Sequence, residues 1–150
     1  MSAPQTQNGD VFRALIEEGF NRGNLEALDN LVTPDFIEHQ DGFDPPNLEG
    51  LKGAIRFLRT AFPDLTLIIE DMITDRDRVW ARLKGRGTHL GPLMGFSPSG
   101  KRIEIDVIDI CRMENGRLAE HWGVADRMHM LQQIGAMPAP PQGAQGKPAA

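Results

Sequence analysis

Asp109 is a carboxylate in an apolar segment of the chain, a position suited to proton transfer. It lies in the run IDVIDIC, and the following Asn115-Gly116 pair has the sequence of a tight hairpin turn. Counting back from that turn places Asp109 opposite Trp122, on a strand face shared with Ile105, Val107 and Cys111. Because burial disfavours the charged form of a carboxylate, these surroundings favour Asp109 as an acid/base residue.

Asp126 is the second candidate carboxylate. In the same register it lies at the end of the strand face that carries Asp109, where a bound molecule would reach it. Both residues also have a structural interpretation. Asp126 can cap the helix that begins at Arg127, and Asp109 can bind Arg112 or a backbone amide.

Two histidines complete the candidate catalytic set. His89 shares the apolar face of a predicted strand over 79–89, and His39 lies in a short extended segment over 35–40. The alternative for each is a core histidine whose ring nitrogens are satisfied by neighbouring groups.

His121 and Glu120 are assigned to opposite faces of the last strand by the hairpin register. His121 is expected on the outer face, at the surface or in an interface, unless a bulge at Gly123 turns it inward. Glu120 is either a pocket residue or the partner of a neighbouring arginine.

The elements that position these residues follow from hydrophobic periodicity. Helices are predicted over 10–22, 24–33 and 48–62, and long antiparallel strands over 65–73, 79–89, 102–113 and 118–125, followed by a helix over 127–134. Three helices followed by four strands predict an α+β fold in which the helices pack on the concave face of a curved sheet. Such a cone encloses a cavity between its two layers.

Composition excludes several classes of protein. The 150 residues carry a net charge of −5, one cysteine and no tyrosine. An internal disulfide, a cysteine-rich zinc site and any mechanism that needs a tyrosine hydroxyl are therefore excluded. The acidic balance and the short apolar runs predict a cytoplasmic protein that binds neither nucleic acid nor membranes.

The domain boundaries follow from local composition. Residues 1–8 and the Pro/Ala/Gly-rich tail 136–150 are predicted to be disordered, which leaves one folded domain over 9–135. The histidines and acidic residues show no helical i, i+4 ligand spacing, so no metal site is predicted.

Four segments of the sequence resemble one known family. They are FPDL (62–65), GTHLGPLMGFSPSGK (87–101), IDICRMENGRLAEHWGVAD (108–126) and LQQIG (131–135). The chain resembles the SnoaL-like branch of the NTF2-like superfamily over about residues 10–135. This branch includes polyketide ester cyclases. The glutamate-histidine-tryptophan run followed by Asp126 is the most specific part of this resemblance.

The resemblance implies an NTF2-like cone and an intramolecular aldol condensation that closes a ring without metal or organic cofactor. It implies that Asp126 is the acid/base residue and that His39 and His89 polarise substrate carbonyls. We expect Asp109 to support one of these histidines. It also implies a homodimer formed through the outer face of the sheet.

The expected substrate is a small hydrophobic carbonyl compound such as a polyketide ester. Its predicted binding residues are Trp122, His121, Glu120, Val79, Leu83, Val107, Phe36 and Met94. The missing tyrosine excludes the usual forms of the ketosteroid isomerases, scytalone dehydratases and epoxide hydrolases that this fold also includes. Two alternatives stay open: a non-catalytic binding or dimerisation module, and a cofactor-free hydroxylase or hydrolase.

Overall fold

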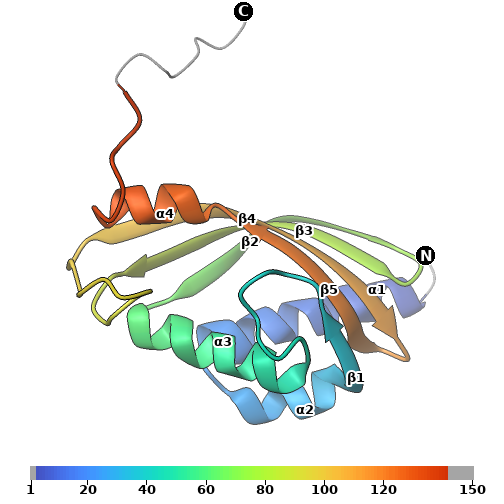
Figure 1. The fold of residues 1–150 in the computed structure, drawn as a ribbon. Coiled ribbons are helices and arrows are strands. Elements are labelled where there is room, and N and C mark those ends of the chain that lie inside the picture. The colour runs from blue at the N-terminus through green and yellow to red at the C-terminus, as the bar shows by residue number, and fades with distance from the viewer. Residues whose placement is uncertain (1–2, 142–150) are drawn as a thin grey trace, which may run out of the picture.

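A curved mixed sheet arches over the N-terminal helices in the computed structural model, which describes residues 3–141 (Figure 1). The sheet has the order β1-β5-β4-β3-β2. Its strands are β1 (Val32–Glu38), β2 (Thr66–Asp75), β3 (Arg78–Thr88), β4 (Arg102–Glu114) and β5 (Arg117–Ala125). This arrangement confirms the predicted α+β fold with helices on the concave face of the sheet.

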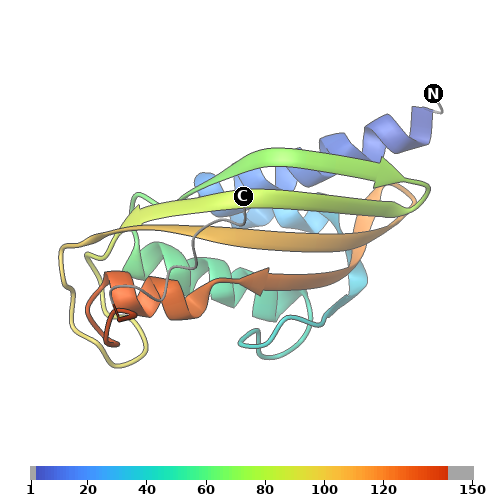
Figure 2. The same ribbon diagram turned by 90° about the horizontal axis from the view of Figure 1, so that it is seen from above.

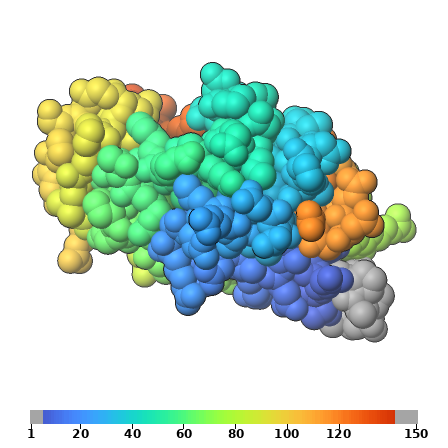
Figure 3. Space-filling model, turned by 90° about the horizontal axis from the view of Figure 1, so that it is seen from below, coloured from blue at the N-terminus to red at the C-terminus, as the bar shows by residue number. Residues whose placement is uncertain are grey.

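Within the described residues, the helical elements are four α-helices, one π-helix and one short 3₁₀ turn. They are α1 (Ala3–Ala14), the π-helical η1 (Leu15–Asn21), the 3₁₀ turn η2 (Leu25–Ala27), α2 (Leu28–Leu31), α3 (Leu48–Ala61) and α4 (Arg127–Gln133). Viewed from below, α3 and the helices before it cover the underside of the sheet (Figure 3). Figure 2 shows α4 following β5 at the opposite end of the sheet from the N-terminus.

The structure differs from the predicted boundaries at the N-terminal end. Helix α1 begins at Ala3, so residues 3–8 are helical where a disordered segment was expected, and Asn8 Nδ2 donates a hydrogen bond to the Arg76 carbonyl at 3.1 Å. Residues 136–141 form no helix or strand. Residues 1–2 and 142–150 lie outside the described residues.

Strand β1 is the main correction to the predicted topology. The extended segment begins at Val32, where a helix was expected, and it pairs in parallel with β5 instead of remaining a separate piece. The sheet is therefore mixed, with one parallel pair at its edge. This pairing places Glu38 beside His121.

A β-bulge in β5 overturns the predicted register. The pairs Glu114–Arg117 and Met113–Leu118 fit the tight turn, but the next pair is Arg112–Glu120, so Ala119 is an extra residue. A slip of one residue exchanges the two faces of a strand. The predicted pairing of Asp109 with Trp122 is therefore wrong, and Asp109 pairs with Gly123.

The core lies between the concave face of the sheet and the helices. Phe12, Ile55 and Leu83 come from α1, α3 and β3, and each is almost fully buried. Asn47 caps the start of α3, because its side chain accepts a hydrogen bond from the Gly50 amide. Pro63 follows the helix, and the amide of Phe62 closes it on the Leu58 carbonyl at 2.8 Å.

Two glycines of α3 give a matched test of this packing. A Cβ at Gly50 would lie 1.6 Å from the Pro45 carbonyl oxygen, whereas a Cβ at Gly53 would meet nothing within 4 Å. We expect Gly50→Ala to lower the free energy of unfolding by about 1–3 kcal/mol. We expect Gly53→Ala to raise it by about 0.5–1 kcal/mol, because alanine loses less backbone entropy in a helix. Urea denaturation of both variants measures the difference, and equal effects would contradict the described packing.

Candidate active site

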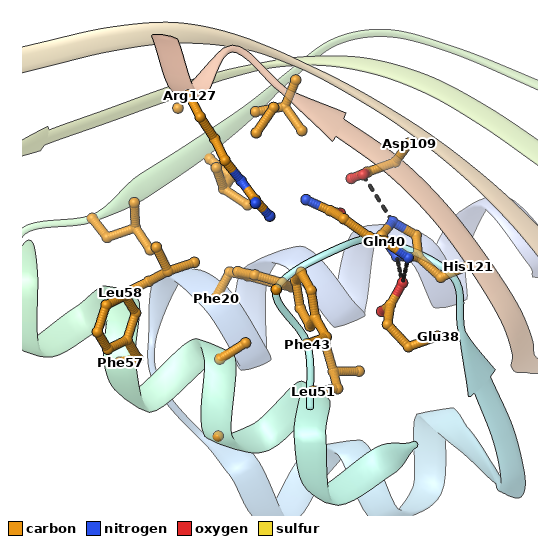
Figure 4. Close-up of a pocket in the computed structure, with 18 of the residues that line it drawn as sticks. Phe20, Glu38, Gln40, Phe43, Leu51, Phe57, Leu58, Asp109, His121 and Arg127 are labelled. Carbon is orange, nitrogen blue, oxygen red and sulfur yellow. Dashed lines mark hydrogen bonds and ion pairs between the residues drawn. The ribbon is translucent and has the colours of Figure 1, made fainter. Parts of the chain in front are cut away.

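A cavity of about 600 Å³ lies between the concave face of the sheet and the helices. Most of its wall is apolar: Phe20 comes from η1, Leu51, Phe57 and Leu58 come from α3, and Val107 comes from β4 (Figure 4). A cavity of this size with an apolar wall and few polar groups is typical of a small-molecule site.

The polar end of the cavity holds a chain of three titratable side chains. His121 Nδ1 lies 2.7 Å from Glu38 Oε1, and His121 Nε2 lies 2.8 Å from Asp109 Oδ1 (Figure 4). The Glu38 side chain is fully buried, and those of His121 and Asp109 are 12% and 10% exposed. Within residues 3–141 the Asp109 carboxylate has no hydrogen-bond partner besides His121, so its other oxygen is available to a bound molecule.

His121 is positively charged at neutral pH in this arrangement. Burial alone lowers the pKa of an imidazole, but hydrogen bonds to Asp109 and Glu38, together with their charges, outweigh burial and raise the pKa of His121 from 6.5 to about 9. An imidazolium uses both ring nitrogens as donors, so His121 donates one hydrogen bond to each carboxylate.

Three features of the backbone bring this chain together. The bulge at Ala119 turns His121 to the concave face, where its strand neighbour on β4 is Cys111. The parallel pairing of β1 with β5 brings Glu38 to the same ring, and the His39 amide donates to the His121 carbonyl at 2.9 Å. Period-two alternation along β4 points Asp109 to the same face as Cys111.

Gly123 provides the space that the polar groups occupy. A Cβ at this position would lie 2.1 Å from Gln40 Oε1, 2.7 Å from His121 Cε1 and 2.9 Å from Asp109 Oδ1. A larger residue would therefore displace at least one of the three side chains. The glycine is required here for close packing between the sheet and the loop after β1.

The structure brings one of the four predicted catalytic residues, Asp109, into the cavity lining. Asp126 is exposed and caps α4, accepting a hydrogen bond from the His129 amide at 3.0 Å. The alternative interpretation of Asp126 as a cap therefore describes its observed contact. The bulge explains the separation, because the predicted register that put Asp126 on the face of Asp109 is shifted by one residue.

Both predicted catalytic histidines lie outside the cavity lining. His89 is fully buried, and its Nδ1 accepts a hydrogen bond from the Ser99 amide at 3.1 Å. His39 stacks on Trp122 with 4.6 Å between ring centroids, and its Nε2 lies 3.2 Å from Glu120 Oε1. Since His39 points away from the concave face, it cannot contact a molecule in the cavity.

The predicted binding residues divide into three groups. His121, Val107 and Met94 line the cavity. Val79, Leu83 and Phe36 are buried in the core and do not line it. Trp122 and Glu120 belong to the convex side of β5, where Glu120 forms an ion pair with Arg112 that lowers the pKa of its carboxyl group.

Sequence reasoning missed Glu38, Gln40 and Arg127, all of which line the cavity. The signal for Glu38 was its period-two spacing from Phe36, because both side chains point from β1 to the buried face. That signal is weak, because Pro34 interrupts the strand and the predicted extended segment over 35–40 is too short to show a clear alternation.

Within residues 3–141, no group of three or more His, Cys, Asp or Glu side chains is arranged to hold a metal ion. In the same range no helix is long and apolar enough to cross a membrane. Burial raises the pKa of the free thiol of Cys111 well above its ordinary value, so this cysteine does not supply a thiolate at neutral pH.

Comparison with known proteins gives this geometry a family context. A family model described as SnoaL-like polyketide cyclase matches residues 10–134. Aklanonic acid methyl ester cyclase DauD from Streptomyces sp. strain C5 is 25% identical over 141 residues, covering 89% of this chain and 85% of that protein. Nogalonic acid methyl ester cyclase from Streptomyces nogalater is 27% identical over 122 residues, covering 77% of this chain and 89% of that protein.

A similar fold occurs in a solved structure of higher sequence identity. The crystal structure of wild-type IdmH from Streptomyces antibioticus is 36% identical, with a TM-score of 0.76, and covers 86% of this chain and 99% of that chain. The residues matched by the family model include the strands that carry the Glu38–His121–Asp109 chain.

The raised pKa of His121 predicts a specific pH dependence of stability. Because the folded-state pKa lies above the unfolded value, its contribution is fully present below pH 6.5 and is lost as pH rises toward about 9. We expect the free energy of unfolding to fall by roughly 3 kcal/mol across that window. Urea denaturation at a series of pH values measures this slope. His121→Gln should abolish it, and the exposed control His129→Gln should retain it; the same slope in both variants would contradict the assignment.

Proposed function

Since the chain belongs to the SnoaL-like polyketide cyclase family, we propose that it is a cofactor-independent cyclase acting by intramolecular aldol condensation. The substrate is a polyketide ester or a similar small carbonyl compound. The observation that carries this proposal is the Asp109 carboxylate, which faces an apolar cavity and is held by His121 and Glu38. The relatives named as aklanonic and nogalonic acid methyl ester cyclases support the substrate class.

Asp109 acts as the base in this proposal. It removes a proton from a carbon between two carbonyl groups, and the resulting enolate carbon attacks a ketone of the same molecule. One C–H bond breaks, one C–C bond forms, and the new alkoxide takes back the proton that Asp109 received. The product is an isomer of the substrate, so the step consumes no oxidant and no second reactant.

His121 and Glu38 are positioning residues. Both donors of the His121 imidazolium are used by carboxylates, so the ring fixes the orientation of Asp109 and leaves the other Asp109 oxygen to the substrate. Glu38 in turn holds the ring through the second nitrogen.

The apolar wall matches a flat, fused-ring molecule. Aromatic and aliphatic side chains such as Phe20, Phe43 and Leu58 would hold the rings, and the exclusion of water would strengthen the electrostatic interactions near Asp109. A folded chain bound in this way already has its reacting carbons close together, which is the main requirement of an intramolecular reaction.

This proposal replaces Asp126 with Asp109 as the base. The resemblance assigned that role to Asp126, but an exposed carboxylate outside the cavity lining would not reach a molecule bound in the cavity. The two aspartates therefore provide a test and its matched control.

We expect Asp109→Asn to lower kcat/KM for ring closure by a factor of about 10²–10⁴, the range usual for loss of an acid/base group. Asp126→Asn should retain the activity, because asparagine caps helices as well as aspartate does. Conversion of nogalonic and aklanonic acid methyl esters, followed by chromatography and mass spectrometry, measures both. Full activity of Asp109→Asn would contradict the assignment, and binding of either ester without turnover would favour a non-catalytic module.

We also propose that two chains associate through the convex face of the sheet. Ile73, Trp80, Ile108 and Val124 are exposed there, while the neighbouring charged residues are paired within the chain, including Arg82 with Asp71. An exposed apolar area bordered by paired charges is typical of a protein interface. The proposed dimer acts in the cytoplasm, a location compatible with its single free cysteine.

A charge placed in this face should separate the two chains. We expect wild-type protein to sediment at twice the mass of one chain and Trp80→Glu to sediment as the monomer, because an unpaired carboxylate in an apolar interface is costly. Leu90→Glu is the control, since Leu90 is also exposed but lies in the loop after β3, outside the strands of the sheet. A monomeric wild type, or a dimeric Trp80→Glu variant, would contradict the proposed interface.

A further inference from the structure

Arg127 brings a guanidinium to the cavity from the residue that follows Asp126. Figure 4 shows its side chain extending into the cavity, toward Gln40 and away from the sheet. One of its nitrogens, Nη2, donates to the Asp41 carbonyl, and the guanidinium packs against Gly42. Within residues 3–141 it forms no ion pair with a carboxylate, so its remaining donors have no charged partner among these residues.

The other charged groups of the lining restrict where an anion can bind. Glu38, Asp44 and Asp109 repel negative charge, and both nitrogens of His121 are already used. Arg127 is therefore the one cationic side chain in the described lining that has donors free for a ligand.

Gln40 contributes a second group at the same place. Its backbone amide donates to Glu38 Oε1 at 2.9 Å, which fixes the start of the loop after β1. Its side-chain amide occupies the space left by Gly123 and extends toward Arg127 (Figure 4). In the described part of the chain this amide has no hydrogen-bond partner, so it too can contact a ligand.

We propose that Arg127 and Gln40 bind a carboxylate that the substrate carries in addition to its reacting carbonyl groups. This inference rests on the proposed cyclase function and specifies its substrate class. A guanidinium fork matches the two oxygens of a carboxylate, and an ester offers neither the charge nor the second equivalent oxygen. Because Asp109 is negative, a carboxylate held at Arg127 also orients the rest of the molecule, whose neutral carbonyl region then lies toward the base.

Binding of a matched pair of flat probes tests this inference without turnover. Anthraquinone-2-carboxylate and its methyl ester differ in the charge of one group, and isothermal titration calorimetry at pH 7.5 gives Kd for each. We expect wild-type protein to bind the carboxylate about tenfold more tightly than the ester. The variant Arg127→Gln should lose this preference and keep the wild-type affinity for the ester.

A charge-matched control separates the local contact from the net charge of the protein. Arg56→Gln on α3 removes the same charge from an exposed residue outside the cavity lining and should retain the tenfold preference. Equal binding of acid and ester by wild-type protein would overturn the inference. So would an equal loss of affinity for both probes in Arg127→Gln, because that result indicates a structural role.

Failure of the cyclase proposal has a different signature. If Asp109→Asn closes rings normally while wild-type protein still prefers the carboxylate, the assigned base is wrong and the carboxylate subsite stands. If Asp109→Asn is inactive and the probes bind equally, the base stands and the subsite is wrong.

Discussion

The extra residue at Ala119 determines which side chains of β5 face the cavity. Without it, the tight Asn115-Gly116 turn would direct His121 to the convex face and Trp122 to the concave one. With it, His121 faces Asp109, and the parallel strand β1 supplies Glu38 at the level where the ring needs a second acceptor. A single inserted residue therefore assembles the polar end of the cavity from three strands. Bulges commonly re-aim side chains next to functional sites in this way.

Burying the Glu38–His121–Asp109 chain costs desolvation free energy, and this cost bears on whether the chain has a structural or a catalytic role. Two carboxylates and an imidazolium are removed from water together, and Glu38 Oε2 has no hydrogen-bond partner among the described residues. Hydrophobic residues of similar volume would satisfy the packing of such a core at lower cost. The hydrogen bonds to His121 offset only part of the desolvation, so a purely structural role gives a weak reason for the arrangement. Positioning Asp109 in an apolar cavity gives a stronger one.

The sequence predicted the fold and part of the site. Hydrophobic periodicity located α3, β2, β3, β4, β5 and α4, and the apolar neighbours of Asp109 identified the one predicted catalytic residue that lines the cavity. The register beyond Leu118 was not predictable, because no residue type marks Ala119 as unpaired and a one-residue slip reverses every later assignment. Glu38 was missed because its importance depends on a parallel pairing between segments far apart in the chain. Long-range pairing of this kind leaves no periodic signal in the sequence.

The sequence neighbours Asp126 and Arg127 show why the site cannot be assigned from a motif alone. Both follow the end of β5, and the family resemblance draws attention to the acidic one. At this point the strand gives way to a helix, so the Asp126 carboxylate turns back to the His129 amide while the Arg127 side chain extends across the cavity. The residue that the motif highlights thus caps a helix, and the residue beside it brings a guanidinium to the cavity lining. The cavity thus holds Asp109, Gln40 and Arg127 together with an apolar wall. In the proposed function, the positions of these groups relative to one another, more than the identity of one aspartate, select the substrate, because a fold shared by many proteins does not itself determine what is bound.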